Sequence, residues 1–284
     1  MPLLQVANVL PDRSVLVHPR EREYNALYRS YSFGHFRLLC QEKPIKETMW
    51  HRNKVKALLK WFLLNPGKLC SADEFIALFW PELAPQAAFG NLYVTMHCLR
   101  HLLEPSLGPR KASKFIRRQS NNFYWFDTDE TWWTDIADVG HLFETAATFD
   151  TYGDDVKASF YYRKLVSHCC LGFLPEDKAE QWLRPYRQHY EHIYLQVLIR
   201  LIQIYQQRGE LEEILEYAYL ALSLDSYCEP AMKAIIDVYF KQGDVDIAMH
   251  KLDDFHSFMQ QEIGVGAGRE LYALRIKIME TAER

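Results

Sequence analysis

The heptapeptide YQQRGEL at residues 205–211 returns as YFKQGDV at residues 239–245. The tyrosine, the glycine and the apolar residue that closes each copy all recur at an offset of 34 residues. This pattern is typical of a helical hairpin, in which the tyrosine lies near the end of one helix, the glycine makes a tight turn and the apolar residue begins the next helix. The two copies therefore predict two hairpins of the same design.

An offset of 34 residues is the period of the tetratricopeptide repeat, in which helical hairpins stack on a shared core. A weaker third copy is expected at Tyr152 and Gly153, and residues 169–178 are then an insertion before the next hairpin. We therefore predict an array of helical hairpins over residues 131–284.

The charged residues are divided unevenly along the chain. Residues 32–126 carry 14 Lys and Arg against 6 Asp and Glu, a balance of +8. Residues 127–284 carry 15 against 28, a balance of -13, and residues 1–31 add +1 to give the formal net charge of -4. A basic region can lie on a polyanion that repels an acidic one, so the asymmetry indicates nucleic-acid binding by residues 32–126.

The basic region begins and ends with strand patterns. Residues 31–41 are rich in aromatic and apolar residues, and a turn at residues 42–44 leads to a second short strand expected at residues 45–49. Residues 115–118 and 123–126 flank a polar tip of four residues, which predicts a β-hairpin.

Three helices are predicted between these strands. The first begins at Asn53 and stops at the Asn-Pro-Gly turn of residues 65–67. Ser71 and Glu74 have the spacing of a capping box, which opens the second helix. The third helix is expected over residues 86–103, with an apolar stripe at three- and four-residue spacing: Leu92, Met96, Leu99 and Leu103.

Two strands, three helices and a hairpin in this order are typical of a winged helix-turn-helix. Its third helix can enter a DNA major groove while the hairpin reaches the backbone or the minor groove. The same elements also suit an unspecialised small α+β domain, so the pattern alone leaves both interpretations open. The predicted fold class is mostly α: an N-terminal α+β winged helix-turn-helix followed by an all-α tetratricopeptide-like repeat domain.

Short segments spread over residues 32–280 carry a family resemblance. They cover the helices and hairpin of the basic region, the linker behind it and parts of the repeats: residues 54–62, 67–71, 79–81, 91–94, 99–100, 115–118, 122–124, 133–135, 172–177, Trp182 and 261–265. In this order they resemble the SARP class of bacterial transcriptional regulators. In that class an OmpR/PhoB-type winged helix precedes tetratricopeptide-like helices called the bacterial transcriptional activation domain.

The resemblance implies a transcription regulator, expected to be an activator, in three parts. These are an N-terminal extension of unknown role at residues 1–30, a winged helix-turn-helix DNA-binding domain at residues 31–128 and a bacterial transcriptional activation domain at residues 129–284. The expected partners are double-stranded DNA and RNA polymerase. Because one small DNA-binding domain buries a modest area, two protomers are expected to associate on adjacent half-sites.

The expected DNA contacts lie on the third helix and the hairpin. The apolar stripe leaves the other arcs of the helix exposed, and six residues are expected there: Asn91, Tyr93, Thr95, His97, Cys98 and Arg100. Of these, Asn91 suits an adenine edge and Arg100 a phosphate. The hairpin contributes four more: Arg117, Arg118, Asn121 and Asn122. The two arginines are adjacent in a strand and point to opposite faces, so at most one meets DNA directly.

Catalytic, metal and cofactor chemistry has no candidate in the sequence. His97 and His101 have the i, i+4 spacing of a metal site, with Cys98 between them, but no third ligand stands at a fitting position. No Walker A, H-E-x-x-H or G-x-S-x-G motif occurs. The adjacent Cys169 and Cys170 are expected to be packed thiols. We therefore predict no enzymatic activity, no cofactor and no metal.

No stretch approaches the roughly 20 apolar residues that a membrane span needs, and the start of the chain has no basic segment ahead of an apolar core. The sequence therefore predicts a cytoplasmic transcription regulator that binds double-stranded DNA, without a membrane partner. The alternative is an adaptor whose repeats bind a protein and whose winged helix has weak or lost DNA binding. Arg100 is the one Lys or Arg of the third helix, and this low basicity keeps the alternative open.

Overall fold

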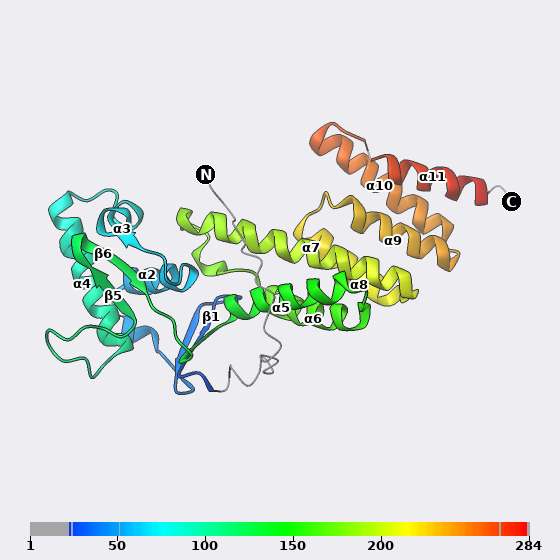
Figure 1. Ribbon diagram of the computed structural model, residues 1–284. Coiled ribbons are helices and arrows are strands. Elements are labelled where there is room, and N and C mark those ends of the chain that lie inside the picture. Colours follow the sequence, from blue (N-terminus) through cyan, green and yellow to red (C-terminus); the bar gives the residue numbers. More distant parts are fainter. Residues whose placement is uncertain (1–22, 24, 51, 267, 283–284) are drawn as a thin grey trace. The chain divides into compact units, whose positions relative to one another are not determined.

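The computed structural model describes four stretches of the chain: residues 23, 25–50, 52–266 and 268–282. The chain forms two compact units (Figure 1). Among the described residues, the N-terminal unit contains those up to Tyr31 and those from Arg37 to Thr134, and the helical unit contains Ser32–Phe36 and those from Asp135 onward. The protein is mostly α, with a small α+β unit followed by an array of helices, so the predicted fold class is confirmed.

The first sheet of the N-terminal unit has the strand order β3-β2-β1-β7. Strand β1 (Tyr28–Tyr31) pairs antiparallel with β2 (Arg37–Cys40), which pairs antiparallel with β3 (Lys43–Pro44). Strand β7 (Trp132–Thr134), at the end of the unit, runs parallel to β1. The sheet therefore joins the two ends of the N-terminal unit.

Two details of this sheet differ from the sequence prediction. The strand expected at residues 31–41 is divided, because residues 32–36 leave the sheet and pack in the helical unit. The strand expected at residues 45–49 is instead the 3-10 turn η1 (Glu47–Trp50), which buries its tryptophan. Beyond the last β2–β3 pair, Leu39 with Pro44, the Ile45 N–H still donates to the carbonyl of Leu38 at 2.8 Å, and the chain then turns into η1.

The three predicted helices are confirmed as α2 (Asn53–Leu64), α3 (Ala72–Phe79) and α4 (Pro85–Leu103). The predicted capping box opens α3: the Glu74 N–H donates to Ser71 Oγ at 3.2 Å, and the Ser71 N–H donates to Glu74 Oε2 at 2.7 Å. The predicted apolar stripe of α4 is 0–1% exposed and forms much of the core: Leu92, Met96, Leu99 and Leu103.

The predicted hairpin consists of β5 (Ile116–Gln119) and β6 (Phe123–Phe126), joined by the 3-10 turn η2 (Ser120–Asn122). Strand β6 also pairs with β4 (Cys70–Ser71), the short strand before α3, so the second sheet has the order β4-β6-β5. Asn122 has a φ of 59°, a left-handed conformation that asparagine tolerates. The N-terminal unit is therefore a winged helix-turn-helix, and β5, η2 and β6 form its wing (Figure 1).

The helical unit consists of helix pairs that follow one another along the chain (Figure 1). The pairs are α5 (Asp135–Thr151) with α6 (Asp155–Cys169), α7 (Arg184–Arg208) with α8 (Leu211–Leu224) and α9 (Glu229–Gln242) with α10 (Val245–Ile263), followed by α11 (Arg269–Ala282). The 3-10 turns η3 (Pro175–Asp177) and η4 (Gln181–Leu183) lie between α6 and α7, in and just after the predicted insertion. The predicted hairpin array is confirmed.

The glycine turns of the second and third hairpins share one geometry. Gly209 and Gly243 end α7 and α9 with φ values of 74° and 88°, a left-handed conformation that glycine adopts without steric penalty. The next N–H closes each turn: Glu210 donates to the carbonyl of Tyr205 at 3.1 Å, and Asp244 donates to that of Tyr239 at 2.9 Å. The repeated heptapeptides therefore encode the same turn twice.

The first hairpin has the same turn, but the predicted alignment of its tyrosine is wrong. Gly153 has a φ of 74°, and the closing hydrogen bond reaches the carbonyl of Phe149 at 2.9 Å. Phe149, four residues before the glycine, is therefore the equivalent of Tyr205. Tyr152, the predicted match, is 80% exposed.

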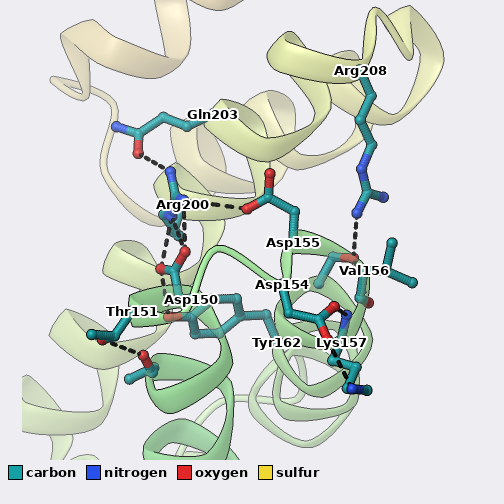
Figure 2. A network of polar contacts seen from close by, with 12 residues as sticks. Asp150, Thr151, Asp154, Asp155, Val156, Lys157, Tyr162, Arg200, Gln203 and Arg208 are labelled. Atoms are coloured by element: carbon teal, nitrogen blue, oxygen red, sulfur yellow. Dashed lines mark hydrogen bonds and ion pairs between the residues drawn. The ribbon is translucent and has the colours of Figure 1, made fainter.

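A polar network joins the first hairpin to α7 (Figure 2). Arg200 of α7 donates three hydrogen bonds to Asp150 near the end of α5: Nε to Oδ2 at 2.8 Å and to Oδ1 at 3.0 Å, and Nη2 to Oδ1 at 2.6 Å. Arg200 Nη2 also lies 3.7 Å from Asp155 Oδ1, and the Tyr162 hydroxyl donates to Asp150 Oδ2 at 3.3 Å. Hydrogen bonding to the Arg200 guanidinium holds the pKa of Asp150 below its usual value.

Residues Ser32–Phe36, which we name the strap, follow β1 directly but pack in the helical unit. Asp135, the first residue of α5, holds the start of the strap: its Oδ2 accepts the Ser32 N–H at 2.6 Å and the Phe33 N–H at 2.8 Å. The Asp135 side chain is buried, and this burial raises its pKa to about 6, although the two N–H groups favour the ionised form.

The rest of the strap pairs with the segment around η3. The Gly34 N–H donates to the carbonyl of Gly172 at 2.7 Å, and the Phe36 N–H donates to Glu176 Oε1 at 2.9 Å. The predicted domain at residues 31–128 includes the strap, whereas the compact units place it with the repeats.

Candidate nucleic-acid interface

Helix α4 has an outer face on the side opposite its buried stripe. Exposed residues form the centre of this face: Gln86, Ala87, Gly90, Val94 and His97. The sequence prediction includes His97 but omits the other four. Helical spacing alone could have predicted their exposure, because these positions lie about half a helical turn from the buried stripe.

The residues predicted on α4 differ in exposure. Tyr93 and His97 are exposed, and Asn91 and Cys98 are half-buried at the edges of the outer face. The predicted exposure of Thr95 is wrong: its side chain is 1% exposed, and Oγ1 donates to the carbonyl of Asn91 at 2.7 Å. A threonine can bury its methyl group and satisfy its hydroxyl on its own helix, so a position beside the stripe does not ensure exposure.

Arg100 is directed toward the wing. Its Nη2 donates to the carbonyl of Ile116 in β5 at 3.4 Å, and its buried Nε has no hydrogen-bond partner within the described residues. Burial lowers the pKa of Arg100. Arg100 therefore ties α4 to the wing, and since it is the one Lys or Arg of α4, the outer face of the helix carries neither residue type.

Tyr93, Arg118 and Asn122 meet where α4 passes the wing, and we name them the helix–wing patch. Arg118 Nη2 donates to Asn122 Oδ1, and the Tyr93 hydroxyl donates to the same oxygen at 3.5 Å. The Arg118 guanidinium carbon lies 5.8 Å from the centroid of the Tyr93 ring, within cation–π range. Tyr93 is 42% exposed and Arg118 is also exposed, so the patch is open to a ligand.

The two wing arginines have different surroundings. Arg117 Nε lies 3.5 Å from Asp127 Oδ2, whereas Arg118 has no acidic partner in the part of the chain that the structure describes. The side chain of Asn121, another predicted contact, lies outside the described residues. Arg118 is therefore the wing arginine with a charge available to an anion.

Acidic residues are absent from the sequence of both elements that form this surface. Neither Pro85–Leu103 nor Ile116–Phe126 contains an aspartate or a glutamate. A carboxylate in either segment would repel a phosphate backbone at contact distance. The outer face of α4 and the helix–wing patch therefore form one surface with a positive charge.

The described part of the chain contains no cluster of side chains that could bind a metal ion. The rings of His97 and His101 lie edge to face with centroids 4.4 Å apart, but no third His, Cys, Asp or Glu completes a group there or elsewhere among the described residues. Cys169 is buried as predicted, whereas Cys170 is exposed. None of the described helices is both long and apolar enough to span a membrane.

Comparisons with known proteins bear on both units. Residues 171–279 match the family model of the bacterial transcriptional activator domain. The chain is similar in structure to Mycobacterium tuberculosis EmbR, solved in complex with a low affinity phosphopeptide, with a TM-score of 0.73 and 16% identity over 90% of this chain and 65% of the EmbR chain. The chain thus spans less than two thirds of EmbR. No curated protein matches it in sequence.

A second solved structure is the C-terminal TPR-containing domain of a Plasmodium falciparum FK506-binding protein, with a TM-score of 0.36 and 15% identity over 51% of this chain and 90% of that one. This likeness is too weak to define the fold. The likeness to EmbR shows the fold, and the family match shows an activator domain that begins just after α6 and includes most of α11. Together they confirm the resemblance to the SARP class of bacterial transcriptional regulators.

Proposed function

Because the chain places a winged helix-turn-helix in front of a bacterial transcriptional activator domain, which is the arrangement of SARP-class regulators, we propose that it regulates transcription by binding specific double-stranded DNA. One observation carries the proposal: the exposed outer face of α4 lies beside Arg118, which has no acidic partner among the described residues, and neither α4 nor the wing contains an aspartate or a glutamate. A single α-helix fits the major groove of B-DNA, which is about 12 Å wide.

In this proposal α4 enters the major groove and the wing meets the backbone. His97 faces the bases, with Asn91 and Cys98 at the edges of the contact. Arg118 and Asn122 donate to phosphate oxygens, because their side chains lie together at the end of the surface nearest the wing. Arg100 acts indirectly: its hydrogen bond to β5 positions the wing relative to α4.

The helical unit acts through proteins in this proposal. Residues 127–284 carry 15 Lys and Arg against 28 Asp and Glu, so this part of the chain is repelled by DNA. Arrays of helical hairpins offer extended surfaces for other proteins. We infer that these surfaces contact RNA polymerase and a second protomer on an adjacent half-site, that the outcome is activation, and that no catalytic step is involved. The site of action is the cytoplasm.

A mobility-shift assay with the promoter next to the protein's own gene tests DNA binding. Arg118→Ala should weaken binding to specific and to random DNA, and should lower the slope of log affinity against log salt by about one, since each phosphate contact contributes about one unit. Arg163→Ala is the matched control, because Arg163 is an exposed arginine on α6. The proposal fails if the wild-type protein shifts no DNA, or if both variants bind as the wild type does.

A second candidate function follows from the position of Arg100. Since this side chain is bound to β5, α4 presents no Lys or Arg outward, which suits a protein-binding surface as well as a groove. The protein would then be an adaptor whose repeats and winged helix both bind proteins. Retention of RNA polymerase on the immobilised protein, together with no DNA shift at any salt concentration between about 20 and 150 mM, distinguishes this function from the first.

A further inference from the structure

Gly90 lies in the middle of the outer face of α4, where the protein itself does not need a glycine. It is exposed, and a Cβ atom added at this position would meet no heavy atom within 4 Å beyond the neighbouring backbone of its own helix. A glycine inside a helix is less stable than an alanine, because its backbone loses more freedom on folding. Such a glycine is typical of a place where another molecule approaches the backbone closely.

Val94 lies one helical turn after Gly90 on the same face and is 41% exposed. At 1.5 Å of rise per residue, the two positions are about 6 Å apart along the helix axis, which is less than two base-pair steps of about 3.4 Å. A close approach at Gly90 therefore brings Val94 to the neighbouring base edges. Its side chain has no hydrogen-bonding group, so the feature of the major groove that it suits is the C5-methyl group of thymine.

Other chemistry on this face does not suit guanine. Guanine O6 and N7 are typically recognised by an arginine or a lysine, and Arg100 is already bound to β5. On the premise of the proposed function, we propose that the protein selects an A·T pair where Gly90 and Val94 face the groove. Gly90 permits the close approach of α4, and Val94 contacts the thymine methyl.

The first test separates the effect of Gly90 on DNA binding from its effect on stability. Gly90→Ala should raise the melting temperature by roughly 2–5 °C, because alanine is the better helix former, yet should weaken specific DNA binding by roughly tenfold or more. Gly140→Ala is the matched control: Gly140 is an exposed glycine of α5, and a Cβ atom added there would likewise meet no heavy atom within 4 Å. This control should stabilise the protein without changing DNA affinity. Wild-type affinity in Gly90→Ala would overturn the proposal.

The second test removes single methyl groups from the DNA. A binding site is first selected from random duplexes with the full chain, and each thymine is then replaced in turn by deoxyuridine. At one thymine of each half-site the wild-type protein should lose about fourfold in affinity, the effect of one buried methyl group, and Val94→Ala should be indifferent to the same replacement.

The outcomes of the second test separate the inference from its premise. If selection yields no bound duplex, the proposed DNA-binding function itself fails. If a duplex is selected but every uridine replacement is harmless, or Val94→Ala keeps the wild-type sensitivity to the methyl group, the protein binds DNA without the proposed contact, and only this inference is overturned.

Discussion

Replacement of Asp135 by asparagine should change how the stability of the protein depends on pH. The Asp135 side chain is 1% exposed, and its Oδ2 accepts the Ser32 N–H at 2.6 Å and the Phe33 N–H at 2.8 Å. Asparagine keeps one oxygen for these two bonds but cannot ionise. Because Oδ1 is buried and has no hydrogen-bond partner among the described residues, the new amide adds an unpaired donor. This donor contributes a loss of about 1–3 kcal/mol in the free energy of unfolding that does not itself depend on pH.

The pH-dependent part follows from the raised pKa of Asp135. Burial raises this pKa from 3.8 to about 6, so the carboxylate is less favourable in the folded protein than in the unfolded chain. A difference of about two pH units between the folded and unfolded pKa corresponds to about 3 kcal/mol. Protonation of Asp135 therefore stabilises the folded protein. This stabilisation is fully present below about pH 4 and is lost as the pH rises through about 6. Between pH 7.5 and pH 5 the wild-type protein therefore gains about 1.4 kcal/mol from this one group.

Urea unfolding followed by circular dichroism at pH 7.5 and pH 5.0 measures the effect. The difference in free energy of unfolding between the wild type and Asp135→Asn should grow by about 1.4 kcal/mol at the lower pH, in favour of the wild type. Asp135→Ala leaves two buried N–H groups without an acceptor and should be about 2–5 kcal/mol less stable than the wild type at pH 7.5. A wild-type-to-asparagine difference that does not change with pH refutes the reasoning.

Three further changes test other parts of the helical unit. Arg200→Ala should lower the free energy of unfolding by about 1–2 kcal/mol, and a double-mutant cycle with Asp150→Ala should show that most of this loss is their mutual interaction. N-ethylmaleimide at pH 8 should label Cys170, which is exposed, well before Cys169, whose pKa burial raises to about 12; equal labelling by mass spectrometry contradicts this. Gly243→Ala should destabilise the protein by about 1 kcal/mol in thermal unfolding, because the φ of 88° is strained for alanine, and an unchanged melting temperature argues against a strained turn.

The parts of the fold that depend on local chemistry could be predicted from the sequence. The capping box of Ser71 and Glu74 involves residues three apart, so its pattern is complete within one turn of helix. The turns at Gly209 and Gly243 likewise depend on local sequence: a residue in the left-handed conformation lies between two helices whose apolar residues recur at helical spacing. In the first hairpin the same turn follows Phe149, and the alignment failed because a phenylalanine replaces the tyrosine that defined the motif.

The parts that depend on distant residues could not be predicted in this way. The strap leaves the sheet because Asp135 and Glu176, which lie far along the chain, accept its N–H groups. Arg100 has the sequence appearance of an exposed cation, but it is drawn to the carbonyl of Ile116 in β5. The sequence predicts each residue of the helix–wing patch as a DNA contact. It does not predict their contacts with one another, because these depend on how the wing packs against α4.

The course of the chain limits how the proposed DNA binding of the N-terminal unit and the proposed protein binding of the helical unit can be separated by experiment. The chain passes between the two units after residues 31, 36 and 134. A cut after Thr134 leaves the strap without Asp135 and uncovers Phe33 and Phe36, which are 5% and 6% exposed in the whole chain. A cut between the strap and β2 instead removes β1, to which both β2 and β7 pair. Truncation therefore damages one unit whichever cut is chosen, and loss of activity in a fragment reports misfolding as well as a missing function. Substitutions on an outer surface leave both units complete, so Gly90→Ala, compared with its control Gly140→Ala, tests DNA binding in the whole chain.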